Sequence, residues 1–201
     1  MCGIVGYIGS KQAAPILLDG LSKLEYRGYD SAGIAVRDGA DKVKIVKAKG
    51  RLKGLIEKTD DGHAVPGTCG IGHTRWATHG EPSETNAHPH VSDDGNVVGV
   101  HNGIIENYEE LKDHFGLADE LISDTDSEVV AAVLNRFYTG DPHEALFQTV
   151  KCLKGTFALV VIFDDIPDVI FAIRNVSPIV AAYREDGTML ASDVAALGGQ
   201  A

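Results

Sequence analysis

Residues 3–8, Gly-Ile-Val-Gly-Tyr-Ile, form a short apolar run that predicts a β-strand almost at the first residue of the chain. Similar runs predict strands at residues 31–37, 43–48, 69–75, 156–163, 168–173, 179–183 and 188–191. Apolar spacing predicts helices at residues 12–25, 52–58, 106–115, 126–138 and 143–153. Strands therefore lead, helices fill the middle and strands close the chain. This segregated order favours a layered α+β domain over a doubly wound parallel sheet.

The composition of the 201-residue chain is that of an ordinary globular protein, with 44% hydrophobic and 23% charged residues. The 18 Lys and Arg residues against 29 Asp and Glu residues give a net charge of −11. Without a long basic run, the chain is a poor candidate for binding nucleic acid. No apolar stretch approaches the roughly 18 residues of a membrane span. Three scattered cysteines suit neither a disulfide framework nor a zinc ribbon. We expect a soluble cytoplasmic enzyme or binding domain.

Cys2 follows the initiator Met and is small enough for Met1 to be removed. Its free α-amine, with a reference pKa of about 8, could then act as base for its own thiol, with a pKa of about 8.5. One residue would supply both nucleophile and base. The alternative is that position 2 holds an incidental small residue.

The pair Asn102-Gly103 can supply a side-chain amide and a backbone N–H to the oxyanion of an acyl-transfer reaction. The same pair is a strong hairpin signal, so residues 96–105 predict a strand that a turn at Asn102-Gly103 interrupts. A turn that projects the Asn amide would satisfy both interpretations.

Substrate recognition by an amidase would need a cation for a carboxylate and an anion for an ammonium group. Arg75, at the end of a predicted strand, can offer a planar fork to a carboxylate, or it can be a surface arginine. Asp126 can bind an ammonium group, or it can simply favour the start of a helix, with Thr125 and Glu128 at capping-box spacing. Trp76, from position alone, is expected to pack rather than to bind.

Residues 77–95 lack periodicity, and a loop this long in a compact domain usually carries function. Near it lies a concentration of histidines: His73, His79, His88, His90 and His101. Their spacing matches no zinc signature, so we expect hydrogen-bonded histidines that shape the loop rather than a metal site. No cofactor is expected.

Six segments occur in an order that resembles one family: residues 2–6 (CGIVG), 25–33 (EYRGYDSAG), 73–80 (HTRWATHG), 86–90 (NAHPH), 101–107 (HNGIIEN) and 123–126 (SDTD). The series is similar to the N-terminal glutaminase domain of the glutamine–fructose-6-phosphate aminotransferases, which are class II glutamine amidotransferases. The resemblance implies an N-terminal nucleophile hydrolase fold, a four-layer αββα sandwich of two mainly antiparallel sheets between helical layers. It also implies L-glutamine as substrate.

By the same resemblance, Cys2 attacks the glutamine carboxamide, and Asn102 with the Gly103 N–H holds the oxyanion. Arg75 would bind the α-carboxylate and Asp126 the α-amine of glutamine. A loop from His73 to about Glu81 would close over the substrate. Its members expected at the substrate are Trp76, Thr78 and His79. In the full-length family enzyme, ammonia passes to a sugar isomerase domain that binds fructose 6-phosphate and makes glucosamine 6-phosphate. A homodimer is one assembly that the resemblance allows.

The resemblance covers residues 1–197, which we interpret as one glutaminase domain that lacks its C-terminal part. Residues 198–201, Gly-Gly-Gln-Ala, do not resemble the family's continuation and are expected to be a cloning remnant. No sugar phosphate site is expected in this chain. If Met1 is retained, the proposed base is absent. The alternative to a glutaminase is a non-catalytic glutamine-binding or assembly module left by truncation.

Overall fold

The computed structural model describes residues 2–39 and 41–198, which form two antiparallel sheets. The larger sheet has the order β3 (Lys44–Lys49), β2 (Ser31–Arg37), β4 (Cys69–Arg75), β1 (Gly3–Gly9), β10 (Gly187–Ala191) and β9 (Val180–Arg184). The smaller sheet has the order β5 (His90–Val91), β6 (Val97–Ile105), β7 (Gly155–Phe163) and β8 (Phe171–Asn175). Every neighbouring pair is antiparallel. The strand predicted at the start of the chain, β1, therefore lies inside the larger sheet.

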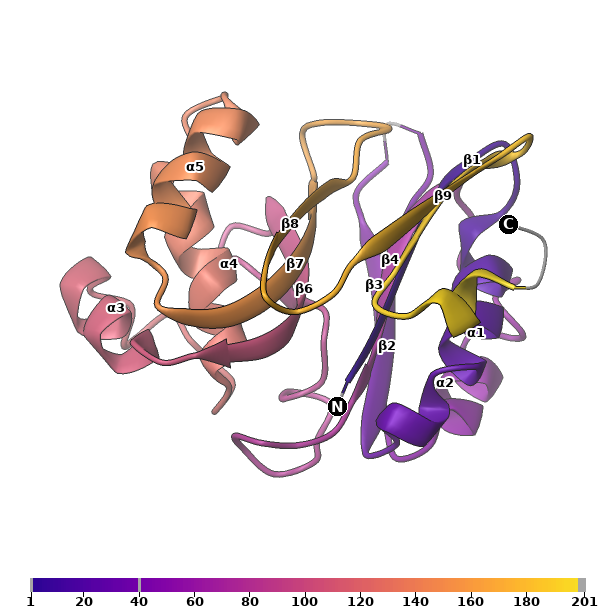
Figure 1. Ribbon diagram of the computed structural model, residues 1–201, viewed down its shortest axis with the longest axis horizontal. Helices are drawn as coiled ribbons and strands as arrows, with labels where there is room; N and C mark the ends of the chain where they lie inside the picture. The colour runs from indigo at the N-terminus through magenta and orange to yellow at the C-terminus, as the bar shows by residue number, and fades with distance from the viewer. Residues whose placement is uncertain (1, 40, 199–201) are drawn as a thin grey trace.

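Helices cover the outer face of each sheet, so the molecule has four layers (Figure 1). The larger sheet carries α1 (Ala13–Ser22) and α2 (Leu52–Lys58), with the short 3-10 helices η1 (Glu25–Arg27) and η2 (Val194–Leu197) nearby. The smaller sheet carries α3 (Tyr108–Phe115), α4 (Asp126–Phe137) and α5 (Pro142–Cys152). The expected αββα arrangement is confirmed.

The central core lies between the two sheets, where apolar side chains of both inner faces meet. Its buried members are Ile4, Ala35, Cys69, Ile71, Val98, Val100, Ala158, Val160 and Ile162. Along β1 the side chains alternate, because Ile4 faces this core while Val5 and Tyr7 pack beneath α1. Both faces of β1 are thus covered, which explains why its sequence is apolar without the polar alternation of a half-exposed strand.

The structure corrects several predicted boundaries. The predicted turn at Asn102-Gly103 is wrong, because β6 pairs with β7 without a break from Val97 to Ile105. Gly103 is needed there because it has φ +129° and because a Cβ would lie 1.9 Å from the Thr156 carbonyl oxygen. The predicted loop 77–95 contains β5, and the predicted helix 12–25 ends at Ser22.

Within residues 2–39 and 41–198, no helix is long and apolar enough to span a membrane. Met1 lies outside the described residues, and so do residues 199–201 of the segment interpreted as a cloning remnant.

Candidate active site

A cavity of about 470 Å³ opens where the start of β1 and the end of β4 meet the strand β6 and the first turn of α4. In Figure 1, β1 begins at the lower end of the larger sheet. The lining includes every site residue that the sequence singled out: Cys2, Arg75, Trp76, Thr78, His79, Asn102, Gly103 and Asp126. Cys2 and Asp126, which are far apart in the chain, are thereby brought to one site.

Cys2 is half-buried at the base of this cavity, one residue ahead of β1. Its Sγ accepts a hydrogen bond from the Trp76 backbone N–H at 3.2 Å. Burial raises the pKa of the Cys2 thiol, and the hydrogen bond from the Trp76 backbone opposes that rise. The resting group is therefore a thiol at neutral pH, and its use as a nucleophile requires a base.

Asn102 lies on β6 and faces Cys2 across the gap between the sheets. Its Nδ2 donates to the Cys2 carbonyl oxygen at 3.1 Å. Its Oδ1 lies 3.0 Å from His73 Nε2. Both ends of this amide are therefore held, the oxygen by His73 on β4 and the nitrogen by Cys2 just ahead of β1.

Arg75 is not a surface residue, because it is only 3% exposed. Its guanidinium donates to the carbonyl oxygens of His79, Gly80 (2.9 Å) and Glu81 (3.4 Å). Asp30 lies 3.9 Å from it and also accepts a hydrogen bond from the Ala77 backbone N–H. Arg75 thus holds the backbone of the loop that follows β4 while it lines the cavity.

The remaining loop residues lie closer to solvent. Trp76 is 46% exposed, so it is not the core residue that its position alone predicted. Its ring meets the Tyr29 ring edge-on at 5.2 Å. The His79 ring meets Tyr108 at 5.8 Å, and Thr78 completes this side of the lining. The loop therefore forms one wall of the cavity.

Asp126 is the first residue of α4, as expected, and only 4% of its surface is exposed. Its Oδ2 accepts from the Ile105 backbone N–H at 2.8 Å, and its Oδ1 accepts from the Ser127 hydroxyl at 3.3 Å. Thr125 caps the helix, whereas Glu128 accepts backbone N–H groups further upstream and does not complete the capping box. A buried carboxylate therefore lines the cavity with its orientation fixed.

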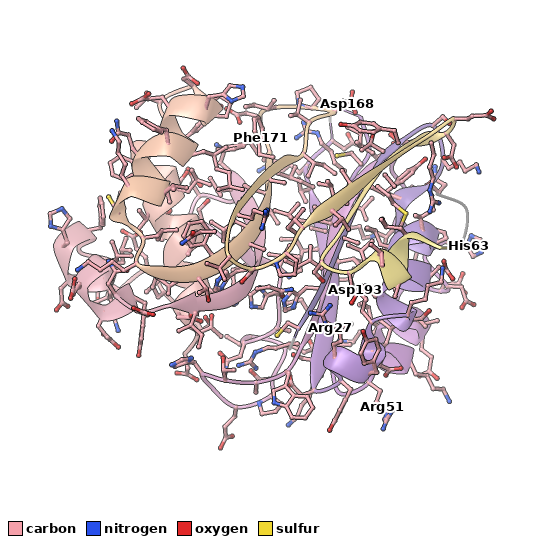
Figure 2. The ribbon with its side chains drawn as sticks, in the orientation of Figure 1. Arg27, Arg51, His63, Asp168, Phe171 and Asp193 are labelled. Atoms are coloured by element: carbon pink, nitrogen blue, oxygen red, sulfur yellow. The ribbon has the colours of Figure 1, made fainter. Side chains whose placement is uncertain are left out.

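Sequence reasoning missed a cation in the lining. Arg27, at the end of η1, lines the cavity and binds Asp193 at 3.0 Å (Figure 2). It belongs to the segment 25–33, which contributed only to the family resemblance and was not assigned a site role. The lining also includes Ser177 and Pro178 from the loop after β8.

Four buried residues, His73, His88, His90 and His101, form a group that we call the histidine cluster, and two of them, His88 and His101, line the cavity. The rings of His73 and His88 stack at 4.0 Å, and those of His88 and His90 meet at 4.5 Å. Hydrogen bonds tie the cluster to Asn102 and to Thr125 and Ser127 at the start of α4. Among the residues that the structure describes, no group of three His, Cys, Asp or Glu side chains is arranged to hold a metal ion.

Comparison with known proteins gives the class of this protein. Residues 73–198 match the family model described as the glutamine amidotransferase domain, and the chain belongs to this family. It is 52% identical over 200 residues to glutamine–fructose-6-phosphate aminotransferase (isomerizing) of Caldanaerobacter subterraneus subsp. tengcongensis. It is 50% identical over 198 residues to a protein of the same name from Thermus thermophilus. Each alignment covers 98% of this chain and 32% of the relative, so the chain spans about a third of these relatives.

Two solved structures show that the fold is shared more widely. The glutamine phosphoribosylpyrophosphate amidotransferase from B. subtilis matches with a TM-score of 0.84 at 24% identity, over 98% of this chain and 43% of that one. A glutamine aminotransferase class-II domain protein from Silicibacter pomeroyi matches with a TM-score of 0.65 at 16% identity, over 95% and 88% of the two chains. The N-terminal nucleophile type of fold expected from the sequence is confirmed.

Proposed function

We propose that this chain hydrolyses L-glutamine to glutamate and ammonia through a γ-glutamyl thioester on Cys2. The observation that carries the proposal is the cavity, in which a thiol, the pair Asn102-Gly103, a guanidinium and a carboxylate line one space. These are the groups that an amidase for an amino acid requires: a nucleophile, oxyanion donors, and partners for an α-carboxylate and an α-ammonium.

The chemistry begins with removal of Met1, which frees the α-amine of Cys2. The amine takes the thiol proton, and Sγ attacks the carboxamide carbon of glutamine. The tetrahedral intermediate then collapses. The leaving nitrogen takes a proton from the α-ammonium group of Cys2 and departs as ammonia. Water, deprotonated by the same amine, hydrolyses the thioester and releases glutamate. The Trp76 N–H, which contacts Sγ, favours the thiolate during the first step.

The oxyanion of each tetrahedral intermediate is assigned to Asn102 and Gly103. The Asn102 amide nitrogen carries two hydrogens, and one of them is used on the Cys2 carbonyl. The second hydrogen is therefore available to a reacting oxygen beside Sγ. The Gly103 N–H would be the second donor.

The α-carboxylate and α-ammonium of glutamine are assigned to Arg75 and Asp126. Arg75 has five N–H donors and can bind a carboxylate while it keeps loop carbonyls. Asp126 is a buried carboxylate whose described donors are uncharged, so an ammonium group would supply its counter-charge. Trp76, Thr78 and His79 would close the loop over the substrate.

In the full-length protein, the ammonia would convert fructose 6-phosphate to glucosamine 6-phosphate in a fused sugar isomerase domain. The relatives that carry this name extend through about three times the length of this chain. We place this activity in the cytoplasm, with a homodimer as the assembly to be tested. The mechanism above invokes no cofactor.

The test combines intact mass with covalent labelling. Mass spectrometry of the purified chain is expected to report Cys2 as the first residue. A diazoketone analogue of glutamine should then add one equivalent of mass at Cys2, and the Cys2→Ala variant should take up none. Labelling of Cys69 or Cys152 instead would contradict the proposal. Calorimetric binding of glutamine without ammonia release, from protein that begins at Cys2, would favour the non-catalytic alternative.

A further inference from the structure

The contact between His73 and Asn102 suggests a role for a residue that the proposed mechanism does not use. His73 lies in the middle of β4, is fully buried, and is paired on both sides by β1 and β2. Opposite it on β2 is Gly33, where a Cβ would lie 2.2 Å from the His88 carbonyl oxygen. The absence of a side chain at Gly33 lets the loop that carries His88 approach, and the His88 ring then stacks on His73 at 4.0 Å. The plane of the His73 ring is thereby fixed.

The proton on the His73 ring can be assigned from its partners. Nε2 lies 3.0 Å from the His101 carbonyl oxygen and 3.0 Å from Asn102 Oδ1. A carbonyl oxygen can only accept, so Nε2 carries the hydrogen and donates. Nδ1 is buried without a hydrogen-bond partner in the described structure, which is tolerable for an acceptor and costly for an N–H donor. Burial also lowers the pKa of His73 to about 3, so the ring is neutral and has this single N–H.

This assignment determines which end of the Asn102 amide faces Cys2. Because Nε2–H donates, the group that it meets must be the amide oxygen, and the amide nitrogen then points to Cys2. A rotation of the amide by 180° would bring Nδ2–H against Nε2–H and would present an oxygen to the oxyanion. Both consequences are repulsive, so the His73 contact selects the orientation that can stabilise negative charge.

We propose that His73 is a positioning residue for glutamine hydrolysis, which uses its Nε2–H to hold the Asn102 amide with its nitrogen toward the oxyanion. The inference rests on the proposed function, since it gives Asn102 the role assigned there. His73 does not line the cavity and acts only through Asn102. Its loss should therefore reduce the rate of the chemical step without changing ground-state binding of glutamine.

The test compares His73→Leu and His73→Gln in the chain from which Met1 has been removed, after intact mass has shown that Cys2 is the first residue. Leu removes the donor, whereas the Gln amide nitrogen can reach the position of Nε2. For His73→Leu we expect kcat to fall roughly 10- to 100-fold, less than the 10²–10³-fold of a lost oxyanion donor, because some Asn102 amides keep the correct orientation. The KM for glutamine and the Ki for product glutamate should stay within about threefold. His73→Gln should recover at least about fivefold in kcat.

Two measurements separate positioning from a structural effect. Alkylation of Cys2 by iodoacetamide passes through no oxyanion, so its rate should be the same in His73→Leu and the parent. His90→Leu is the matched control, because it removes another buried imidazole of the histidine cluster that contacts Thr125 rather than Asn102. Its kcat should stay within about threefold of the parent.

If His73→Leu does not fold, His73→Gln is compared with His73→Asn, whose amide is too short to reach Asn102. His73→Gln should then be the faster variant.

The inference is overturned if His73→Leu keeps kcat within threefold of the parent, if His90→Leu loses as much as His73→Leu, or if Gln gives no recovery and no advantage over Asn. Failure of the proposed function has a different signature. In that case the parent chain that begins at Cys2 releases no ammonia, or the Cys2→Ala variant releases as much as the parent.

Discussion

The side-chain amide of Asn102 donates a hydrogen bond to the backbone carbonyl oxygen of Cys2, 3.1 Å away, and so joins residues 100 positions apart in the chain. Cys2 precedes a central strand of the larger sheet, and Asn102 lies on the smaller sheet. The relative position of the proposed nucleophile and the proposed oxyanion donor is therefore set by how the two sheets pack.

Replacing Asn102 by Ala should lower kcat for glutamine hydrolysis by about 10²–10³-fold, because one of the two proposed oxyanion donors is lost. The KM should change little, since this interaction strengthens only as charge develops. Glutamate formation at saturating glutamine measures the effect. A variant with parental kcat would remove Asn102 from the mechanism.

Replacing Asp126 by Asn should raise the KM for glutamine by roughly 10- to 100-fold, the amount expected for a lost charged hydrogen bond. The Asn oxygen can still accept from Ile105, so the start of α4 should be retained. The control is a substrate analogue without the α-amino group, which should bind the parent and the variant equally weakly. The assignment would be contradicted if the variant preferred glutamine over the analogue without the α-amino group as strongly as the parent does.

Replacing Gly103 by Ala should destabilise the fold by about 2–4 kcal/mol, because the new Cβ meets the Thr156 carbonyl and the residue has φ +129°. Gly99→Ala in the same strand is the matched control. There the nearest atom to a Cβ is Val161 Cγ2, at an ordinary 3.5 Å, so we expect a change below about 1 kcal/mol. Urea unfolding of both variants measures the difference. Equal stability of the two would contradict this interpretation of Gly103.

The histidine cluster should make the fold sensitive to acid. Burial lowers the pKa of His73 to about 3 and also lowers the pKa values of His88, His90 and His101. Unfolded histidines titrate near pH 6.5, so below about that pH the unfolded state binds more protons than the folded state. The free energy of unfolding should therefore fall with falling pH, by up to about 1.4 kcal/mol per pH unit for each histidine, until each folded pKa is reached.

Urea unfolding between about pH 8 and 4.5 measures this slope. His73→Gln removes one titrating group. It should reduce the slope of unfolding free energy against pH by up to about 1.4 kcal/mol per pH unit between about pH 6.5 and 4.5. A variant with an undiminished slope would show that His73 does not contribute to the acid sensitivity.

Replacing Val176 by Gly should stabilise the fold by about 1 kcal/mol. Val176 has φ +70° in a tight turn closed by the Ser177 N–H on the Asn175 carbonyl oxygen at 2.9 Å. A β-branched side chain is strained in that region, and this one is 73% exposed and gains little from packing. Val176→Ala keeps the strain of a Cβ and should gain less. Thermal unfolding of the two variants tests the order.

Periodicity in the sequence was sufficient to predict most elements and the layered class of fold. Strands β1, β2 and β4 are buried on both faces, so their apolar runs are easily recognised. The prediction of a turn at Asn102-Gly103 failed because an Asn-Gly pair in the sequence is equally compatible with a hairpin turn and with a glycine in a strand that lets a neighbouring carbonyl approach. Only the packing of β7 distinguishes the two.

The candidate site was predictable in its membership but not in its contacts. The family resemblance named eight residues, and all of them line one cavity. That Arg75 would be buried and would hold loop carbonyls was not visible, because its partners are backbone atoms, which have no sequence signature. The link from His73 to Asn102 joins two sheets and likewise has no local signal.

The location of Cys2 has a practical consequence for anyone who produces this protein. Strands β4 and β10 flank β1 on both sides, and Cys2, one residue ahead of β1, lines the cavity. An affinity tag fused ahead of Cys2 would extend from a residue of the cavity lining and would convert the proposed catalytic α-amine to an amide. Purification handles therefore belong at the carboxyl end, or must be cut off so that the sulfur-bearing residue becomes the first.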